Sequence, residues 1–385
     1  MAELTLFKEK TYHKSTPKTL IVNKNKFIEI LKSLSNGNSL PDIKKELLFL
    51  KNLFLNYTSD NLGLLNIDKN GDTIHFNQEF LLKELEQIIE AQTKERAVYY
   101  LNRLIKGITE IKTGKINDIN LNRWKEYTEI ITDSLWILDK RDNSGAHLGW
   151  YWGNFVPQIP RQLMLRYTKK GDWVLDPFVG SGTTLIECRK LGRNGIGIEL
   201  QKDVIEKAET LIQKEVMEKA EKLIQREENK FNVTTKMFQG DSRNINLKNI
   251  LKQVGINKVQ LLIMHPPYYD IIKFSNNPND LSNAKSIDDF LKMFGEVVDN
   301  TYPILENNRY FGLVIGDKYH KGEWIPLGFY CMQEVLKRGY QLKSIIVKNF
   351  EETRGKRNQK ELWRYRALVG GFYIFKHEYI FLFKK

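Results

Sequence analysis

The segment that decides the fold of this chain is Trp173-Val174-Leu175-Asp176-Pro177-Phe178-Val179-Gly180-Ser181-Gly182-Thr183-Thr184. It begins as a short apolar strand and turns at two glycines into a helix predicted over residues 185–191. A second strand is predicted over residues 195–199 and ends at Glu199. A strand, a glycine-rich turn, a helix and another strand in this order are typical of a parallel sheet with crossover helices.

The remaining C-terminal sequence continues this alternation. An apolar run at residues 259–264 predicts a buried strand, and later strands are predicted over residues 311–315, 342–347 and 379–383. We therefore expect a doubly wound, Rossmann-like α/β domain over residues 141–385. Within it, residues 203–230 read as one long amphipathic helix, either an extended crossover helix or the seam of a dimer.

Residues 1–140 are predicted to form a mostly helical accessory domain. Apolar residues recur at three- and four-residue spacing in residues 26–31, 43–55 and 80–104. Between these stretches, alternation around Asn70-Gly71 predicts a β-hairpin over residues 65–76.

Composition excludes several classes of protein. No apolar run approaches the roughly 18 residues of a membrane span, and the first residues lack the apolar stretch of a signal peptide. The two cysteines, Cys188 and Cys331, form no CxxC or Cys/His cluster, which excludes a disulfide framework and a thiolate zinc site. We expect a cytoplasmic protein with no contact to membranes and no need of a metal.

The charge balance favours a polyanionic partner. The 385 residues include 60 Lys and Arg against 47 Asp and Glu, a net charge of +13, and nucleic acid is the commonest partner of such a protein. A basic loop is predicted over residues 349–366, and its candidate DNA-binding residues are Arg354, Lys356, Arg357, Lys360, Trp363 and Arg364. The alternative is a solvated loop with Trp363 and Tyr365 packed in the core.

The glycine turn has the chemistry of a nucleoside site. Gly180 and Gly182 allow close approach of a ligand to the backbone, and the following helix begins with free N–H groups. Glu199 is placed to accept hydrogen bonds from ribose hydroxyls. The Gly-Lys-Ser/Thr ending of a phosphate loop and the third glycine of a dinucleotide site are both missing, which favours S-adenosylmethionine.

The block of residues 176–184 closely resembles motif I of the S-adenosylmethionine-dependent DNA amino-methyltransferases, Asp-Pro-Phe-x-Gly-Ser-Gly-Thr-Thr. The resemblance covers roughly residues 147–385 and implies the class I methyltransferase form of the doubly wound sheet, with S-adenosyl-L-methionine as cofactor. The residues it places at the cofactor are Phe155, Pro157, Asp176, Pro177, Phe178, Gly180, Ser181, Gly182, Thr183, Glu199 and Asp241. Asp241 has the alternative role of a helix cap.

The second candidate site is the turn His265-Pro266-Pro267-Tyr268, which directly follows the apolar run of residues 259–264. Prolines stiffen the turn and direct its carbonyl groups outward. The first side chain and the Pro266 carbonyl can accept the two hydrogens of a base amine, which is preorganised electrostatic catalysis. Tyr268 offers a face on which a flipped base can stack. The turn resembles the family's Asp-, Asn- or Ser-Pro-Pro-Tyr/Phe/Trp turn, from which His265 departs.

Three interpretations of His265 stay open. A neutral imidazole can accept one amine hydrogen, the Pro266 carbonyl can carry the chemistry without it, or the chain is an inactive DNA-binding relative. If the neutral imidazole is the acceptor, methylation should decline as the pH falls through the imidazole pKa.

The resemblance implies site-specific methylation of double-stranded DNA with base flipping, at adenine N6, slightly favoured, or at cytosine N4. It implies a role in restriction–modification or phage defence and leaves open a separate restriction endonuclease as partner. The alternatives are an RNA (tRNA) base amino-methyltransferase and an inactive subunit that binds cofactor and DNA. Residues 1–140 are the candidate DNA-recognition domain.

Overall fold

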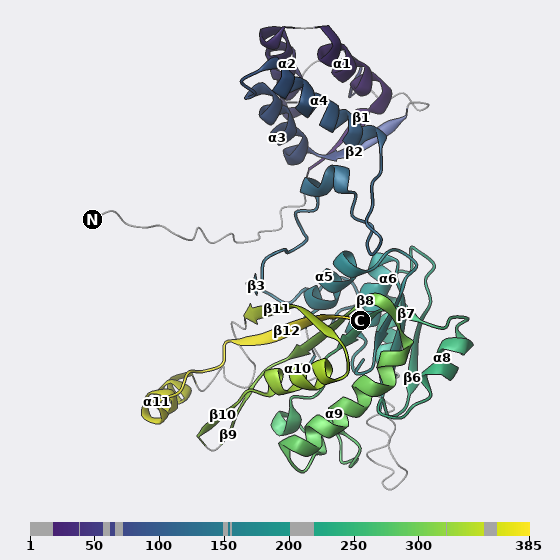
Figure 1. The fold of residues 1–385 in the computed structure, drawn as a ribbon, viewed down its shortest axis with the longest axis vertical. Coiled ribbons are helices and arrows are strands. Elements are labelled where there is room, and N and C mark those ends of the chain that lie inside the picture. The colour runs from purple at the N-terminus through teal and green to yellow at the C-terminus, as the bar shows by residue number, and fades with distance from the viewer. Residues whose placement is uncertain are drawn as a thin grey trace. The chain divides into compact units, whose positions relative to one another are not determined.

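The chain divides into two compact units in the computed structural model. One unit comprises residues 1–114 and 119–128, and the other comprises residues 115–118 and 129–385 (Figure 1). The residues that the structure describes are 18–37, 39–56, 62–65, 72–148, 153–154, 156–200, 219–320, 322–349 and 360–385. Within these ranges, no helix is both long enough and apolar enough to span a membrane.

The N-terminal unit packs helices against a small antiparallel sheet. Its described elements are β1 (Thr19–Asn23), α1 (Lys24–Gly37), α2 (Leu40–Asn56), β2 (Thr73–Asn77), α3 (Gln78–Ile89), α4 (Lys94–Thr109) and the 3₁₀ helix η1 (Leu121–Glu126). Phe27 lies at the centre of its core, edge-on to Phe54 and Phe76. The strand β2, which is the second half of the predicted hairpin, pairs with β1 instead. Residues 66–71 lie outside the described ranges.

The C-terminal unit is built on an eight-stranded sheet with the order β3-β11-β12-β8-β7-β4-β5-β6. The strands are β3 (Leu135–Trp136), β4 (Trp173–Asp176), β5 (Asn194–Glu199), β6 (Thr235–Gln239), β7 (Val259–Met264), β8 (Leu305–Ile315), β11 (Gln341–Asn349) and β12 (His377–Lys384). Strands β4 to β8 run parallel, and β12 runs antiparallel to both β8 and β11. The chain moves outward from β4 to β6 and returns to the other side of β4 as β7. The predicted doubly wound sheet is thus confirmed.

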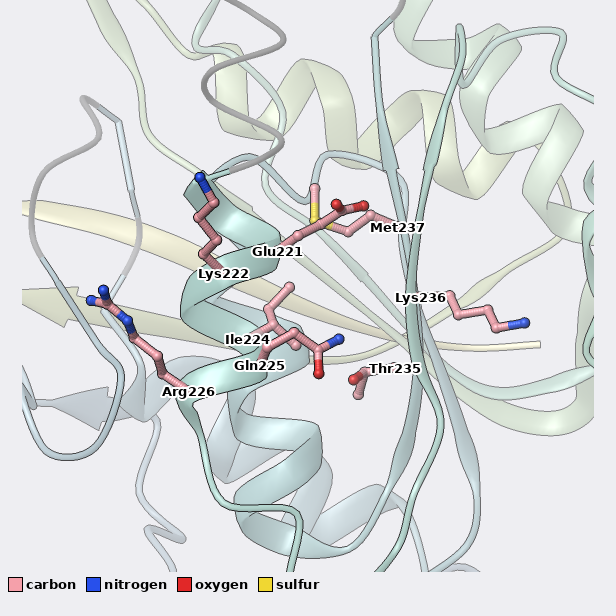
Figure 2. A pocket seen from close by; sticks show the side chains of 8 residues that line it. All are labelled: Glu221, Lys222, Ile224, Gln225, Arg226, Thr235, Lys236 and Met237. Atoms are coloured by element: carbon pink, nitrogen blue, oxygen red, sulfur yellow. The ribbon is translucent and has the colours of Figure 1, made fainter.

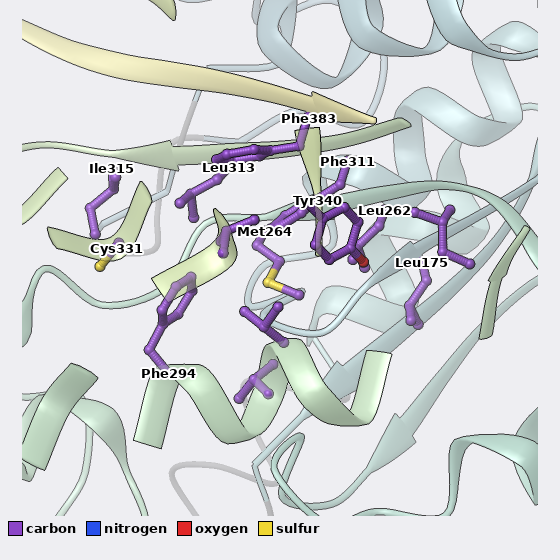
Figure 3. Packing of buried hydrophobic residues seen from close by; sticks show 14 of the residues in the cluster. Leu175, Leu262, Met264, Phe294, Phe311, Leu313, Ile315, Cys331, Tyr340 and Phe383 are labelled. Carbon is purple, nitrogen blue, oxygen red and sulfur yellow. The ribbon is translucent and has the colours of Figure 1, made fainter. Parts of the chain in front are cut away.

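Helices cover both faces of this sheet. Leu262 and Met264 of β7 pack with α8 (Leu247–Gln253), α9 (Ile287–Thr301) and α10 (Leu327–Lys337), in the cluster shown in Figure 3. Leu261 and Ile263, on the opposite face, pack with α5 (Gln158–Tyr167) and α6 (Thr183–Leu191). Burial on both faces explains why β7 is a continuous apolar run instead of an alternating one.

Glycines on the α6 face of β5 let the glycine turn lie flat on the sheet. A Cβ atom on Gly197 would lie 2.5, 2.7 and 2.9 Å from three side-chain atoms of Val179. A Cβ atom on Gly195 would lie 2.5 Å from Leu185. The Val179 N–H also donates to the carbonyl oxygen of Ile198 at 3.1 Å. Strand β5 therefore sets the position of the turn that follows β4.

Two predicted elements differ from the structure. Residues 219–226 are helical, but the helix ends there, before residue 230. The Asn229 side chain bonds both the N–H and the carbonyl of Val233, and Asn232 adopts φ 51°, which turns the chain toward β6. Residues 201–218 of the predicted long helix lie outside the described ranges.

The predicted loop over residues 349–366 is the second difference. From Lys360 onward it is a helix, α11 (Lys360–Gly370), and residues 350–359 are not described. Apolar residues recur at helical spacing in α11, beginning with Leu362 and Tyr365, and this spacing was the available signal for a helix. The remaining short elements are η2 (Tyr269–Ile271), η3 (Leu281–Asn283), η4 (Tyr302–Ile304), β9 (Lys318–His320) and β10 (Glu323–Ile325).

The contact between Gly197 and Val179 can be tested by overpacking. We expect Gly197→Ala to lower the free energy of unfolding by about 1–3 kcal/mol, the usual cost of an extra methyl group in a full core. Urea-induced unfolding of the two proteins measures the difference. In the double variant Gly197→Ala/Val179→Ala the loss should be smaller than the sum of the single losses. Additive losses would contradict the contact.

Candidate functional site

The predicted site residues gather at one edge of the sheet. The parallel strands β4, β5, β7 and β8 all end there, because parallel strands share the direction of their carboxyl ends. The antiparallel β12 begins at the same edge, where Tyr379 pairs with Ile315. Strands β4 and β7 are neighbours, with Val174 opposite Leu261. The glycine turn and the His265 turn therefore follow adjacent strands.

The glycine turn depends on backbone angles that favour glycine. Gly180 has φ 46° and Gly182 has φ 80°, both in the left-handed region. Gly182 is the N-cap of α6, and no side chain caps the helix. A helix that begins at a glycine has no cap side chain of its own, so a ligand can satisfy the N–H groups of its first turn.

Asp176 is fully buried beneath the turn. One carboxylate oxygen accepts the Phe178 N–H at 2.9 Å, and the other accepts the Thr184 hydroxyl at 2.5 Å. Burial raises the pKa of Asp176 to about 6. Because both oxygens bond the turn, the geometry supports a positioning role for Asp176. Its predicted contact with a cofactor stays a prediction.

Glu199 closes the other side of the turn. Its Oε2 accepts the Gly180 N–H at 3.1 Å. Burial, with smaller contributions from the nearby Asp280 and Asp176 carboxylates, raises the pKa of Glu199 to about 7. The predicted contact of Glu199 with ribose hydroxyls stays a prediction.

Asp241 has a partner that the sequence did not indicate. Both of its carboxylate oxygens accept from the Arg243 guanidinium at 2.7–3.1 Å. Its backbone carbonyl accepts the N–H groups of Asn244 and Ile245, so the residue also closes a tight turn after β6. A ligand at Asp241 would have to share the carboxylate with Arg243. Its predicted contact with the cofactor therefore stays a prediction.

The segment before α5 reaches the glycine turn through Asn154. The Asn154 side-chain oxygen accepts the Thr183 hydroxyl at 2.7 Å, and Ser181 lies 3.4 Å from the same hydroxyl. Pro157 is the N-cap of α5, and its carbonyl accepts the Arg161 N–H. Phe155 lies outside the described residues. Asn154 was absent from the predicted site, since a single Asn in a loop carries no pattern.

The His265 turn is held by a chain of polar contacts. His265 Nε2 lies 3.2 Å from the Tyr268 hydroxyl, which donates to Glu378 Oε2 at 2.7 Å. The other oxygen of Glu378 lies 3.0 Å from Lys348 Nζ. Burial, opposed by Glu378 and aided by Lys348, lowers the pKa of His265 to about 4. The imidazole is therefore neutral near pH 7, as an acceptor role requires.

The ring of Tyr268 is fixed by its surroundings. It stands edge-on to His265, with ring centroids 5.5 Å apart at 87°. Its other neighbour is Gly316, where a Cβ atom would lie 2.9 Å from Tyr268 Cε2. Gly316, Glu378 and Lys348 were not predicted to belong to the site. A lone acid at the start of the apolar strand His377–Lys384 was the available signal for Glu378.

The candidate DNA-binding residues are only partly described. Arg354, Lys356 and Arg357 lie outside the described residues, as does the side chain of Lys360. Arg364 is exposed on α11, and Trp363 lies beneath the Arg366 guanidinium at 5.3 Å. Tyr365 is 64% exposed, so the alternative in which it packs in the core is wrong.

A pocket lies between the helix of residues 219–226 and β6 (Figure 2). It is lined by Glu221, Lys222, Ile224, Gln225, Arg226, Thr235, Lys236 and Met237. None of the predicted catalytic or cofactor residues lines it. Among the described residues, no group of three or more His, Cys, Asp or Glu is arranged to hold a metal ion.

Comparison with known proteins gives two family matches. Residues 21–210 match a DNA methylase family, and residues 162–301 match an RMKL-like methyltransferase domain. The structure of an S-adenosylmethionine-dependent methyltransferase from Methanosarcina mazei aligns with a TM-score of 0.37 and 12% identity, over 57% of this chain and 95% of that chain. At this TM-score the structural similarity carries no functional argument.

Curated relatives match in part. The Type II methyltransferase M2.DpnII of Streptococcus pneumoniae is 44% identical over 136 residues, covering 28% of this chain and 50% of the relative. The Type II methyltransferase M.Cfr9I of Citrobacter freundii is 36% identical over 75 residues, covering 20% of this chain and 24% of the relative. The chain thus spans half or less of the length of these relatives. By its family match, its relatives and its motifs, it belongs to the DNA amino-methyltransferase family.

Proposed function

We propose that the chain methylates an exocyclic amine of a base in double-stranded DNA, with adenine N6 as the first candidate and cytosine N4 as the second. One observation carries the proposal: the glycine turn and the His265 turn follow adjacent parallel strands, β4 and β7. The proposed cofactor site at the glycine turn and the proposed base site at the His265 turn, which must meet for methyl transfer, thus share one sheet edge. The family's methyl donor is S-adenosylmethionine.

The residues at the glycine turn fit this cofactor. The uncapped start of α6, the left-handed backbone at Gly180 and Gly182, and the Glu199 carboxylate form a site for a nucleoside. When bound, S-adenosylmethionine supplies an electrophilic methyl group, and transfer to an amine leaves S-adenosylhomocysteine and releases one proton. In this proposal Glu199 binds the ribose, and Asp176 keeps the turn in shape.

The His265 turn prepares the amine. The imidazole and the Pro266 carbonyl each accept one amine hydrogen, which withdraws the nitrogen lone pair from the ring and stabilises the positive charge that develops there. Neutral imidazole can do this because it has one acceptor nitrogen. The Tyr268 ring, fixed between His265 and Gly316, provides a surface for the extruded base.

We further propose that the N-terminal unit reads the DNA sequence and that basic residues near α11, such as Arg364, contact phosphates. A restriction–modification role is supported by the names of the relatives, which are Type II methyltransferases. We propose a separate restriction endonuclease as the partner in that role. These parts of the proposal rest on family membership and on charge.

Methylation in cells tests the function directly. Expression of the chain in a host that lacks DNA methylation should place a modified amine in one short sequence motif of the genome. Tyr268→Ala, expressed at the same level, should leave no modified sites, because the base loses its support. Modified tRNA with unmodified DNA would show the RNA alternative to be right. An absence of methylated nucleic acid with intact cofactor binding would show the chain to be an inactive binding subunit.

The pKa values predict two separate pH dependences. Ionised Glu199 accepts hydrogen bonds from both ribose hydroxyls, so affinity for S-adenosylmethionine should rise as the pH increases through about 7. His265 stays neutral down to about pH 4, so the transfer step with saturating cofactor should change little between pH 8 and pH 6. Calorimetric titration and single-turnover methylation measure the two quantities.

Substitution of Glu199 tests whether its carboxylate causes the pH dependence of cofactor affinity. Glu199→Gln should weaken cofactor binding about 10- to 100-fold, since bonds to a charged group contribute roughly 1.5–3 kcal/mol, and should flatten the pH dependence. Asp172→Asn, at the opposite edge of the sheet, is the matched control. It should retain both the affinity for the cofactor and the pH dependence of that affinity. An unaltered pH dependence in Glu199→Gln would remove Glu199 from the cofactor site.

The close approach of Gly316 to Tyr268 gives a further prediction. In Gly316→Ala the new methyl group would meet the Tyr268 ring at 2.9 Å and displace it from the base-binding position. We expect methylation to fall at least tenfold, while the affinity for S-adenosylmethionine stays within twofold of the wild type. Equal methylation rates for the two proteins would contradict the assigned position of the Tyr268 ring.

A further inference from the structure

Lys348 and Glu378 form a buried ion pair at the catalytic edge of the sheet. They are directly opposite each other in the antiparallel pairing of β11 and β12. Lys348 is 5% exposed and Glu378 is 4% exposed, and the Nζ–Oε1 distance is 3.0 Å. Removing two charges from water is costly, and an apolar pair would fill such a place with less penalty. The position of the pair behind Tyr268 suggests a purpose beyond stability.

The order of hydrogen bonds determines where the proton of His265 lies. Glu378, ionised beside Lys348, can only accept, so the Tyr268 hydroxyl donates to it at 2.7 Å. That hydroxyl has then used its single proton, and its contact with His265 at 3.2 Å requires Nε2 to donate. A neutral imidazole with its proton on Nε2 carries its lone pair on Nδ1.

We propose that Glu378, paired with Lys348, is a positioning residue that acts through the Tyr268 hydroxyl to keep the proton of His265 on Nε2, so that Nδ1 accepts the substrate amine. The inference rests on the proposed function and deepens it. Asp, Asn or Ser at this position of the turn carries an acceptor oxygen, but a histidine accepts only through the nitrogen that lacks the proton. A fixed tautomer therefore makes the departure at His265 compatible with catalysis.

The same row of hydrogen bonds gives the Tyr268 hydroxyl a function of its own. Stacking with a base needs only the aromatic ring, which phenylalanine would also provide. The hydroxyl links His265, in the turn after β7, to Glu378, at the start of β12. Tyr268→Phe thus separates the two roles, because it keeps the ring and the ion pair but breaks the link.

Nitrogen NMR of the full chain, labelled with ¹⁵N-histidine, tests the proposal without methyl transfer. Long-range proton–nitrogen spectra distinguish the two neutral tautomers, and the spectrum of His265→Gln identifies the His265 signals. The wild type should carry the proton on Nε2. In Tyr268→Phe and in Glu378→Gln, the fraction of His265 with its proton on Nδ1 should rise, because the first variant removes the hydroxyl to which Nε2 donates and the second allows an amide N–H to donate to that hydroxyl. Arg309→Met, which breaks an ion pair at the opposite edge, should leave the signals unchanged.

Kinetics of the same variants connect the tautomer to the reaction. We expect kcat to fall about 10- to 100-fold in Glu378→Gln and in Tyr268→Phe, as for other partners that orient a histidine. The KM for S-adenosylmethionine should stay within twofold of the wild type, and Arg309→Met should match the wild type in both constants. Tyr268→Phe keeps the proposal testable if Glu378→Gln does not fold.

The possible outcomes separate this proposal from the proposed function. A wild-type His265 with its proton on Nδ1, or an unchanged Nε2 tautomer in folded Tyr268→Phe and Glu378→Gln, would overturn the positioning role even if the wild type methylates DNA. Conversely, the expected tautomers in a wild type that methylates no DNA would uphold the positioning of His265 and refute the proposed function.

Discussion

The parallel pairing of β4 with β7 is the constraint on which the site depends. The register Val174–Leu261 and Leu175–Leu262 brings the ends of the two strands to the same level. The chain reverses its direction of winding between these strands, and in open α/β sheets ligands bind at the strand ends beside such a reversal. The glycine turn and the His265 turn are distant in sequence, yet they follow the adjacent ends of these two strands.

Burial at this edge gives the ionisable groups different properties. Desolvation disfavours the charged form of each group, so it raises the pKa of Glu199 to about 7 and lowers that of His265 to about 4. Near neutral pH, the first group is thus partly ionised and the second is uncharged. In the proposed function, the glycine turn needs a group that can ionise and the His265 turn needs an uncharged one. Desolvation, modified by local partners, provides both.

His265 departs from the family's turn, and its contacts through Tyr268 extend to β12 and β11, on the far side of β8. Histidine in place of Asp, Asn or Ser needs a defined tautomer, and the contacts of Tyr268 with His265 and Glu378 provide a physical means to define it. Lys348 keeps the charge of Glu378 balanced inside the protein. A change at the first residue of the turn is thereby coupled to residues on β11 and β12.

The sequence by itself determined the doubly wound class of the sheet, the places of its main strands along the chain and the two turns that mark the site. These features are local: apolar periodicity, glycines in a turn and a rigid Pro-Pro pair act between residues close in the chain. The sequence did not indicate that α11 replaces part of the basic loop, that Arg243 binds Asp241, or that Asn154 reaches Thr183. Only the tertiary structure decided the link from His265 through Tyr268 to Glu378 and Lys348. Its members come from three separate segments, and their contact depends on strand order and cross-strand register, which no local pattern encodes.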